Sequence, residues 1–264
     1  MQMRMAKRVK LKSRFQSLEW MAVWFMNVVV LGPAGSGKSL LTWRFGEYLL
    51  REGYSVKFLN LDPGCLTVPY SCDFDIRERF TVERIMAEEG LGPNGAVLRA
   101  MDMLSETRIP ALDGDFVLFD TPGQLEVFAF RGSGPKIVGQ LTDSVGVFII
   151  DATIGVDDLP SAYLYSLAIS FRLGINTLRI VNKVDLLDKQ EAERLSKILY
   201  NPKILVRKVK TMGILADIYL PILRILGKVI PAQRIPLVSA KTGEGFNELL
   251  TMLHEVKCVC GDLT

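Results

Sequence analysis

Histidine is almost absent from this sequence, and cysteine is scarce. The 264 residues include one histidine, His254, and four cysteines. Because that histidine lies near the C-terminus, no Ser-His-Asp or Cys-His pairing for nucleophilic catalysis is available. His254, Cys258 and Cys260 give three possible zinc ligands with no fourth at matching spacing, so we expect no zinc site. With no secretory signal, four cysteines predict reduced thiols and a cytoplasmic protein.

A long apolar run and a strong net charge are also missing. No stretch offers about 18 uninterrupted apolar residues, so we expect no membrane span and no membrane partner. The formal net charge is +3, and six of the 32 basic side chains fall in residues 1–20 beside one acid, Glu19. Because the rest of the chain is close to neutral, we expect no direct nucleic-acid partner.

Residues 1–25 form a basic N-terminal extension. We do not interpret the apolar run after Glu19 as a signal peptide, because cleavage there would remove the first strand of the motif described next. Three explanations stay open: a flexible extension, a weak contact with an anionic surface, or a misassigned start, since Met21 and Met26 both lie just before that strand.

Residues 27–53 carry the first functional pattern. Asn27–Leu31 is a short apolar run typical of a strand buried on both faces, and a helical pattern ends near Gly53. Between them stands the G-x-x-x-x-G-K-[ST] loop, whose N–H groups converge on phosphate oxygens at a helix N-terminus. Lys38 is expected at the β- and γ-phosphates and Ser39 at Mg²⁺. The predicted phosphate-binding residues are Gly32, Pro33, Ala34, Gly35, Ser36, Gly37, Lys38 and Ser39.

Two further apolar runs end in carboxylates. Residues 54–61 lead to Asp62, and residues 115–120 end in Asp120, which Thr-Pro-Gly-Gln follows at 121–124. Because the carboxyl ends of parallel strands border the ligand crevice of open α/β sheets, Asp120 is predicted to hold Mg²⁺ through water. A backbone N–H in residues 121–123 is expected to meet the γ-phosphate. Asp62 is a further Mg²⁺ candidate, although Asp-Pro-Gly is also an ordinary turn.

The pattern N-K-x-D at Asn182, Lys183 and Asp185 follows the last of two more strand-like runs, residues 145–151 and 177–182. Its carboxylate can accept hydrogen bonds from N1–H and the exocyclic amine of guanine, a pair that adenine does not offer. A final strand-like run leads to Ser239, Ala240 and Lys241, where a backbone N–H can bind guanine O6. The sequence therefore favours GTP over ATP.

Taken in this order, the motifs resemble the GPN-loop GTPases, a dimer-forming branch of the P-loop GTPases. The resemblance runs from Asn27 to about Glu255. It rests on the stretches NLDPG, DFDIRERFTVERIM, GLGPNGA, DTPGQLE, NKVD and SAKTGEG. It implies an α/β, three-layer P-loop fold with a mostly parallel central sheet flanked by helices. It also implies a homodimer that uses GTP/GDP and Mg²⁺.

The turn Gly92-Pro93-Asn94 lies between two helical patterns and, by itself, is also compatible with a plain connector. The resemblance implies that it inserts toward the nucleotide of the other subunit and helps to place the attacking water. Pro93 fixes φ and Gly92 permits close approach. Gln124 is implied to position the water, with Glu126 as a supporting polar group. The expected catalytic residues are therefore Gln124, Asn94, Gly92, Pro93 and Glu126.

Several positions depart from the family pattern and leave the switch geometry open. They are Leu40 for a second hydroxyl residue, Gly64 for alanine, Ser71 and Cys72 for an acidic residue and proline, and Glu78 for aspartate. Cys65 and Cys72 are expected to pack in the switch region. Neither Arg77 nor Arg131 is identified as an arginine finger, because exposed arginines are usually solvated.

Residues 201–231 are unusually apolar. They are compatible with a helix packed on the sheet, or with a groove for a protein client, since eukaryotic family members are linked to RNA polymerase assembly. The chain looks more like the compact archaeal type, with a single domain at 26–258 and a tail at 259–264. We expect a homodimeric GTPase. The rivals are a GTP-regulated assembly factor with slow turnover, and a P-loop ATPase or small-molecule kinase, against which N-K-x-D argues.

Overall fold

The computed structural model describes residues 25–155, 158–200 and 234–261, together with six positions between 220 and 228. The basic extension up to residue 24 and most of the apolar segment 201–231 lie outside the described residues. The expectations for these two segments therefore stay predictions.

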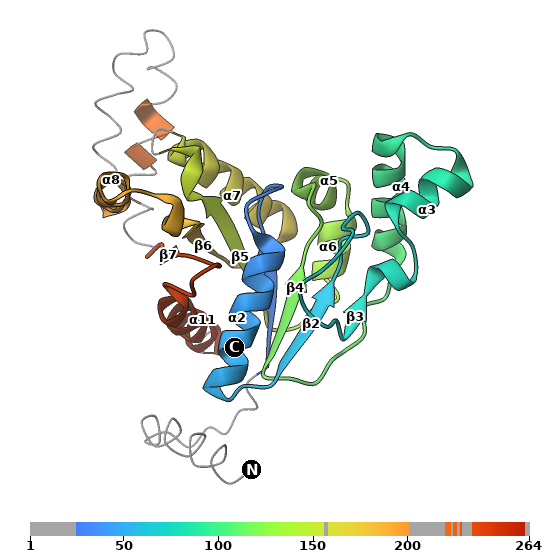
Figure 1. Cartoon of the computed structure of the whole chain (residues 1–264), viewed down its shortest axis with the longest axis horizontal. Coiled ribbons are helices and arrows are strands. Elements are labelled where there is room, and N and C mark those ends of the chain that lie inside the picture. The colour runs from blue at the N-terminus through green and yellow to red at the C-terminus, as the bar shows by residue number, and fades with distance from the viewer. Residues whose placement is uncertain are drawn as a thin grey trace.

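One parallel sheet forms the centre of the fold, with strands in the order β3-β2-β4-β1-β5-β6-β7 (Figure 1). The strands are β1 (Met26–Leu31), β2 (Val56–Asn60), β3 (Phe74–Asp75), β4 (Phe116–Asp120), β5 (Ser144–Asp151), β6 (Thr177–Asn182) and β7 (Leu237–Val238). Six of them were predicted. β3 was not, because two residues are too short to show a side-chain period.

Helices cover both faces of the sheet, which confirms the three-layer α/β fold (Figure 1). One face carries α2 (Lys38–Glu52) and α11 (Phe246–Gly261). The opposite face carries α3 (Val82–Glu89), α4 (Pro93–Glu106), α5 (Leu125–Phe130), α6 (Ser133–Val138), α7 (Leu159–Leu173) and α8 (Lys189–Tyr200).

Strand β1 shows why its sequence is apolar without a break. Val28 and Val30 face the core under α2 and α11, whereas Val29 and Leu31 face the core on the other side. Successive side chains of a strand point to opposite faces, so burial on both faces requires an apolar residue at each of these positions.

The order of the strands fixes where a ligand can bind. β1 lies between β4 and β5. From β1 the chain continues to β2, on the β4 side of β1, and after β4 it crosses over to β5, on the opposite side. Such a reversal opens a crevice at the carboxyl ends of the strands. The phosphate loop after Leu31, Asp120 at the end of β4 and Asn182 at the end of β6 all lie at this edge.

Helix α2 approaches the sheet closely at Gly46. A Cβ atom built there would overlap the ring of Phe58 on β2 and come within 3.2 Å of Leu118 on β4. The absence of a side chain therefore sets the distance between this helix and the sheet, and with it the position of the phosphate loop at the N-terminus of the helix.

We expect Gly46→Ala to lower the free energy of unfolding by about 1–3 kcal/mol through overpacking, despite the better helix propensity of alanine. Denaturant unfolding measures this change. Glu47→Ala, at the next and exposed position, is the matched control and should be close to neutral. A Gly46→Ala protein as stable as the native one would contradict the close packing described here.

Candidate functional site

The eight predicted phosphate-binding residues form one loop from the end of β1 to the first turn of α2. Gly35 and Gly37 have φ of 76° and 96°, which other residues rarely adopt. A Cβ atom on Gly32 would lie 2.6 Å from Ser36 Oγ. The glycines therefore allow a tight loop at the N-terminus of α2, an arrangement that suits an anion.

Lys38 is buried at the centre of this loop. Its Nζ donates to the carbonyl oxygens of Gly32 at 2.8 Å and Pro33 at 3.1 Å. Burial lowers the pKa of Lys38, while the nearby carboxylates of Asp120, Asp62 and Glu126 act in the opposite direction. The ammonium group is thus held inside the loop, where phosphate oxygens would offer it stronger acceptors.

Asp120 is 1% exposed at the end of β4. Its Oδ2 accepts a hydrogen bond from the hydroxyl of Tyr70 at 2.9 Å. Its Oδ1 is buried with no hydrogen-bond partner in the described part of the chain. Burial raises the pKa of Asp120 to about 6, and the groups that oppose this shift include the Ser39 hydroxyl and Lys38. A buried oxygen without a partner beside Ser39 fits a hydrated Mg²⁺ ion, whose water would donate to it.

Asp62 is also at this end of the site, and both of its oxygens accept hydrogen bonds. Oδ1 accepts from the N–H of Gly64 at 2.8 Å, and Oδ2 accepts from the N–H of Gly123 at 2.9 Å. Asp62 therefore connects the loop after β2 to the loop after β4. Because each carboxylate oxygen has two lone pairs, Asp62 can keep both donors and still hold Mg²⁺ directly or through water.

Gln124 and Glu126 follow Gly123 and are both exposed. Gln124 is the N-cap residue of α5, with no side-chain cap bond. Thr121, in contrast, is buried, and its hydroxyl donates to Val30 O at 2.6 Å. The start of the loop is thus fixed to β1, and the part expected to contact water and phosphate faces solvent.

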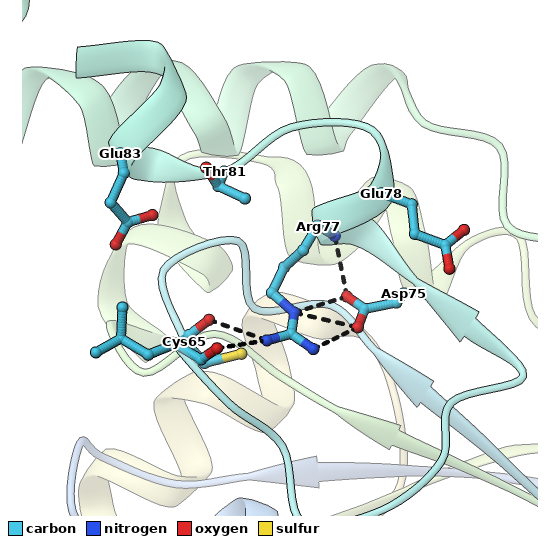
Figure 2. Close-up of a pocket in the computed structure, with 7 residues that line it drawn as sticks. Cys65, Asp75, Arg77, Glu78, Thr81 and Glu83 are labelled. Carbon is cyan, nitrogen blue, oxygen red and sulfur yellow. Dashed lines mark hydrogen bonds and ion pairs between the residues drawn. The ribbon is translucent and has the colours of Figure 1, made fainter. Parts of the chain in front are cut away.

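The Arg77 side chain is mostly buried, with 22% of its surface exposed. Its guanidinium donates to both carboxylate oxygens of Asp75, at distances from 2.6 to 3.1 Å, and to the carbonyl of Leu66 at 2.9 Å. Figure 2 shows it between Asp75 and the Cys65 segment. Burial alone would raise the pKa of Asp75, but hydrogen bonds from Arg77 and Asn60 lower it. Arg77 therefore fixes the loop after Asp62, while Arg131 pairs with Asp102 at 3.3 Å on the surface.

Cys65, Cys72 and Leu40 were also singled out in the sequence, the two cysteines as packing residues and Leu40 as a departure from the family pattern. Cys65 and Cys72 are partly buried free thiols, and burial raises their pKa values to about 11 and about 12. Both thiols are therefore protonated at neutral pH. Leu40 points outward from α2 and is 37% exposed, so it does not enter the phosphate loop.

The residues predicted to bind the base come together at the other end of the crevice. Asn182 Nδ2 donates to Ser36 O and its Oδ1 accepts from the N–H of Ala240, both at 2.9 Å. Asp185 Oδ1 accepts from the hydroxyl of Ser239 at 2.6 Å. Lys241 is exposed beside them. The arrangement fixes the orientation of Asp185 and leaves its second oxygen for a ligand.

The turn Gly92-Pro93-Asn94 lies apart from these residues. All three are exposed, and Gly92 and Pro93 begin α4 as its N-cap and first helical residue. Figure 1 shows the α3–α4 turn at the outer side of the molecule, away from the N-terminus of α2. The structure therefore brings together the phosphate, Mg²⁺ and base residues, but not this turn.

Tyr70, Asn60 and Asp151 contact site residues and were not identified from the sequence. Tyr70 donates to Asp120, Asn60 Oδ1 accepts from the N–H of Asp62 at 3.1 Å, and Asp151 pairs with Lys183 at 2.5 Å. Tyr70 is separated from its partner by 50 positions along the chain, and a single sequence gives no sign of such a contact. Asp151 does end a predicted strand at the ligand edge, which is a usable signal.

Three observations concern the membrane span and the zinc ligands considered in the sequence. Within the described residues, no helix is both long enough and apolar enough to cross a bilayer. His254 lies beside Tyr54 and Phe116, and burial lowers its pKa. The side chains of Cys258 and Cys260 lie outside the description.

Comparison with known proteins agrees with this geometry. Residues 30–259 match a family described as "Conserved hypothetical ATP binding protein". A GPN-loop GTPase of Pyrococcus abyssi is 40% identical over 253 residues, which cover 90% of this chain and 100% of that protein. The structure of an apo GTPase from Pyrococcus abyssi superposes with a TM-score of 0.81 at 37% identity, over 89% of this chain and 98% of the other.

More distant relatives match over a shorter region. GPN-loop GTPase 1 of Dictyostelium discoideum is 32% identical over 64% of this chain and 46% of its own length. GPN-loop GTPase QQT1 of Arabidopsis thaliana is 32% identical over 60% and 58%. The chain thus spans about half the length of these two proteins.

Asp120 gives a testable pH dependence in the nucleotide-free protein. Its pKa is raised from 3.8 to about 6 on folding. The folded state therefore binds the proton more tightly, and stability is lost as the pH rises through this window. Relative to Asp120→Asn, the native protein should lose about 3 kcal/mol of unfolding free energy between about pH 4 and pH 7.

Denaturant unfolding in EDTA at several pH values measures this difference. Asp113→Asn, which removes an exposed carboxylate, should follow the native pH dependence. If Asp120→Asn also runs parallel to the native protein, Asp120 does not carry the shift.

Proposed function

Because this chain belongs to the GPN-loop GTPase family and is a GTPase, we propose that it hydrolyses GTP to GDP and phosphate as a Mg²⁺-dependent homodimer. In this proposal the Gly92-Pro93-Asn94 turn of each copy completes the phosphate end of the other copy's site. The observation that carries it is an exposed turn, remote from its own phosphate loop, with a glycine that the fold of its own chain does not require.

The base end supports GTP rather than ATP as the substrate. Ser239 holds one oxygen of Asp185, so the other is oriented toward an edge that offers two donors, as guanine does. With adenine, this carboxylate would face an acceptor and remain unpaired. The family description mentions ATP, but the residues expected to contact the base, Asp185 and Ala240 among them, favour guanine.

At the phosphate end, the loop N–H groups and Lys38 bind the phosphates. Ser39 would hold Mg²⁺ through its hydroxyl and Asp120 through water, and the bound ion neutralises charge that develops on the phosphate oxygens. For Gly123 to donate to the γ-phosphate, its hydrogen bond to Asp62 has to break. Binding of the third phosphate would thereby release Asp62 and move the loop that carries Gln124, whose exposed amide can then orient water.

Gly92 supports a role for the turn outside its own subunit. Its φ of −69° is open to any residue, and a Cβ atom there would meet nothing within 4 Å. Serine would also be a better N-cap for α4. Since neither the backbone nor the packing of this chain requires glycine, close approach by another molecule is the reason we propose for it.

We further propose a cytoplasmic protein without a nucleic-acid or membrane partner. The free thiols of Cys65 and Cys72 support a reducing compartment. A protein client bound through residues 201–231 is a second proposal, which acceleration of hydrolysis by a client would favour.

Gly92→Ser tests whether glycine at this position serves the folding of its own chain or hydrolysis in the proposed dimer. We expect unchanged or slightly higher thermal stability, unchanged GDP affinity, and a GTP turnover lowered roughly tenfold or more, because the added side chain blocks close approach. Gly90→Ala is the matched control. Gly90 has φ of 65° at the C-cap of α3, so this variant should lose about 1 kcal/mol of stability. Native turnover in Gly92→Ser would remove the main support for the proposal.

Complementation between two inactive variants tests whether the turn acts in trans. Asn94→Ala has an intact pocket and a defective turn, and Lys38→Ala has the reverse. A heterodimer of the two, purified through two different tags, contains one competent site if the turn acts on the partner. It should therefore show about half the GTP turnover of the native dimer.

The matched control pairs the native chain with a chain that carries both substitutions. That heterodimer should be nearly inactive if the turn acts in trans, and about half active if it acts in cis. Light scattering in GDP and in a non-hydrolysable GTP analogue confirms the dimer in each case. The reverse order of the two activities would disprove action across the dimer.

A further inference from the structure

Lys183, the second residue of N-K-x-D, forms an ion pair that its motif does not explain. Its Nζ lies 2.5 Å from Asp151 Oδ2, and the two side chains are 29% and 15% exposed. Asp151 ends β5 and is the register partner of Asn182 on β6. The ion pair therefore lies next to the base-binding residues and is partly shielded from water, so it is stronger than a pair on an open surface.

Asp151 is itself held in one orientation. Its Oδ1 accepts hydrogen bonds from Thr153 N at 2.9 Å and Thr153 Oγ1 at 2.7 Å, and so caps the short turn Ala152–Ile154. Oδ2 is left for Lys183. Burial by itself would raise the pKa of Asp151, but the hydrogen bonds from Lys183 and Thr153 outweigh it and lower the pKa. The carboxylate is thus a fixed anchor rather than a mobile surface charge.

Lys183 is restrained at its other end too. Its φ of 69° places the backbone in the left-handed region, which is uncommon for a residue with a side chain. It lies between Asn182, which binds Ser36 and Ala240, and Asp185, which binds Ser239. With backbone and Nζ both fixed, the four-carbon stem has little freedom, and an ordered apolar stem can cover the flat face of an aromatic ring.

We propose that Asp151 is a positioning residue for the nucleotide base: by holding Lys183 Nζ, it fixes the lysine stem against the face of the guanine ring. This inference rests on the proposed binding of a guanine nucleotide. Asp185 acts on the edge of the base and sets which base is chosen. Asp151 acts through the face of the base, which all purines share, and sets how tightly the base is held.

Calorimetric titration of the full chain with GDP, IDP and XDP separates these two roles. Asp151→Asn keeps an oxygen that can cap Thr153 and loses the ion pair. We expect it to weaken the binding of all three nucleotides by a similar factor of about three to ten, so that their relative order does not change. Asp185→Asn should instead change the order, weakening GDP relative to XDP.

A double-mutant cycle tests whether Asp151 acts through Lys183. Lys183→Met keeps an unbranched apolar stem and removes the ammonium group. It should weaken GDP by a factor close to that of Asp151→Asn, and adding Asp151→Asn to it should have no further effect. Glu193→Gln, which removes the partner of Lys197 in an exposed ion pair, is the matched control and should bind as the native protein does.

The outcomes also distinguish a failure of the inference about Asp151 from a failure of the proposed guanine site. Two results with Asp151→Asn alone would overturn the inference: unchanged GDP affinity, or a changed order of the three nucleotides. A third is a loss of GDP affinity on Asp151→Asn that is as large in the Lys183→Met protein as in the native one. If Asp185→Asn leaves the order of GDP and XDP unchanged, the guanine site itself is wrongly assigned. Because the readout is binding, neither result depends on hydrolysis or on the dimer.

Discussion

The buried amide of Asn182 is the contact on which the rest of the site depends. It donates to Ser36 O in the phosphate loop and accepts from the N–H of Ala240 in the loop after β7. These loops lie 58 or more positions away from it in the chain. A buried amide satisfied on both sides holds both loops at a fixed separation, and few other side chains can offer a donor and an acceptor in this geometry. The phosphate end and the base end are therefore set relative to each other before any ligand binds.

The phosphate end has a second layer of contacts that sequence motifs do not reveal. Tyr70 bonds Asp120, Asp62 bonds Gly123, and Arg77 holds the chain between Asp62 and Leu66. The segment after β2 thus contacts the end of β4 at Asp120 and the loop after β4 at Gly123, both next to the expected positions of Mg²⁺ and the γ-phosphate. Breaking either bond leaves a buried or partly buried group without that partner, so a change in one segment affects the other.

The structure of a single chain explains one turn only in part. The Gly92-Pro93-Asn94 turn begins α4 with a proline at the first helical position, which helix geometry explains. Glycine is an accepted N-cap residue, but the φ and surroundings of Gly92 would also admit serine, and the turn lies away from its own phosphate loop (Figure 1). The second copy proposed above, approaching this turn closely, would account for both features.

The sequence by itself determined the class of the fold and the loops expected to bind phosphate and base. Unbroken apolar runs predict strands buried on both faces, and Gly32–Ser39 and Asn182–Asp185 carry their chemistry within a few consecutive residues, which a linear pattern can show. Only the tertiary structure decided that Arg77 clamps a loop, that Asp62 holds Gly123, and that Tyr70 and Asp151 belong to the site. Contacts such as Tyr70 with Asp120 join residues far apart in the chain. They arise from the order of the strands and the packing between them, which no local period encodes.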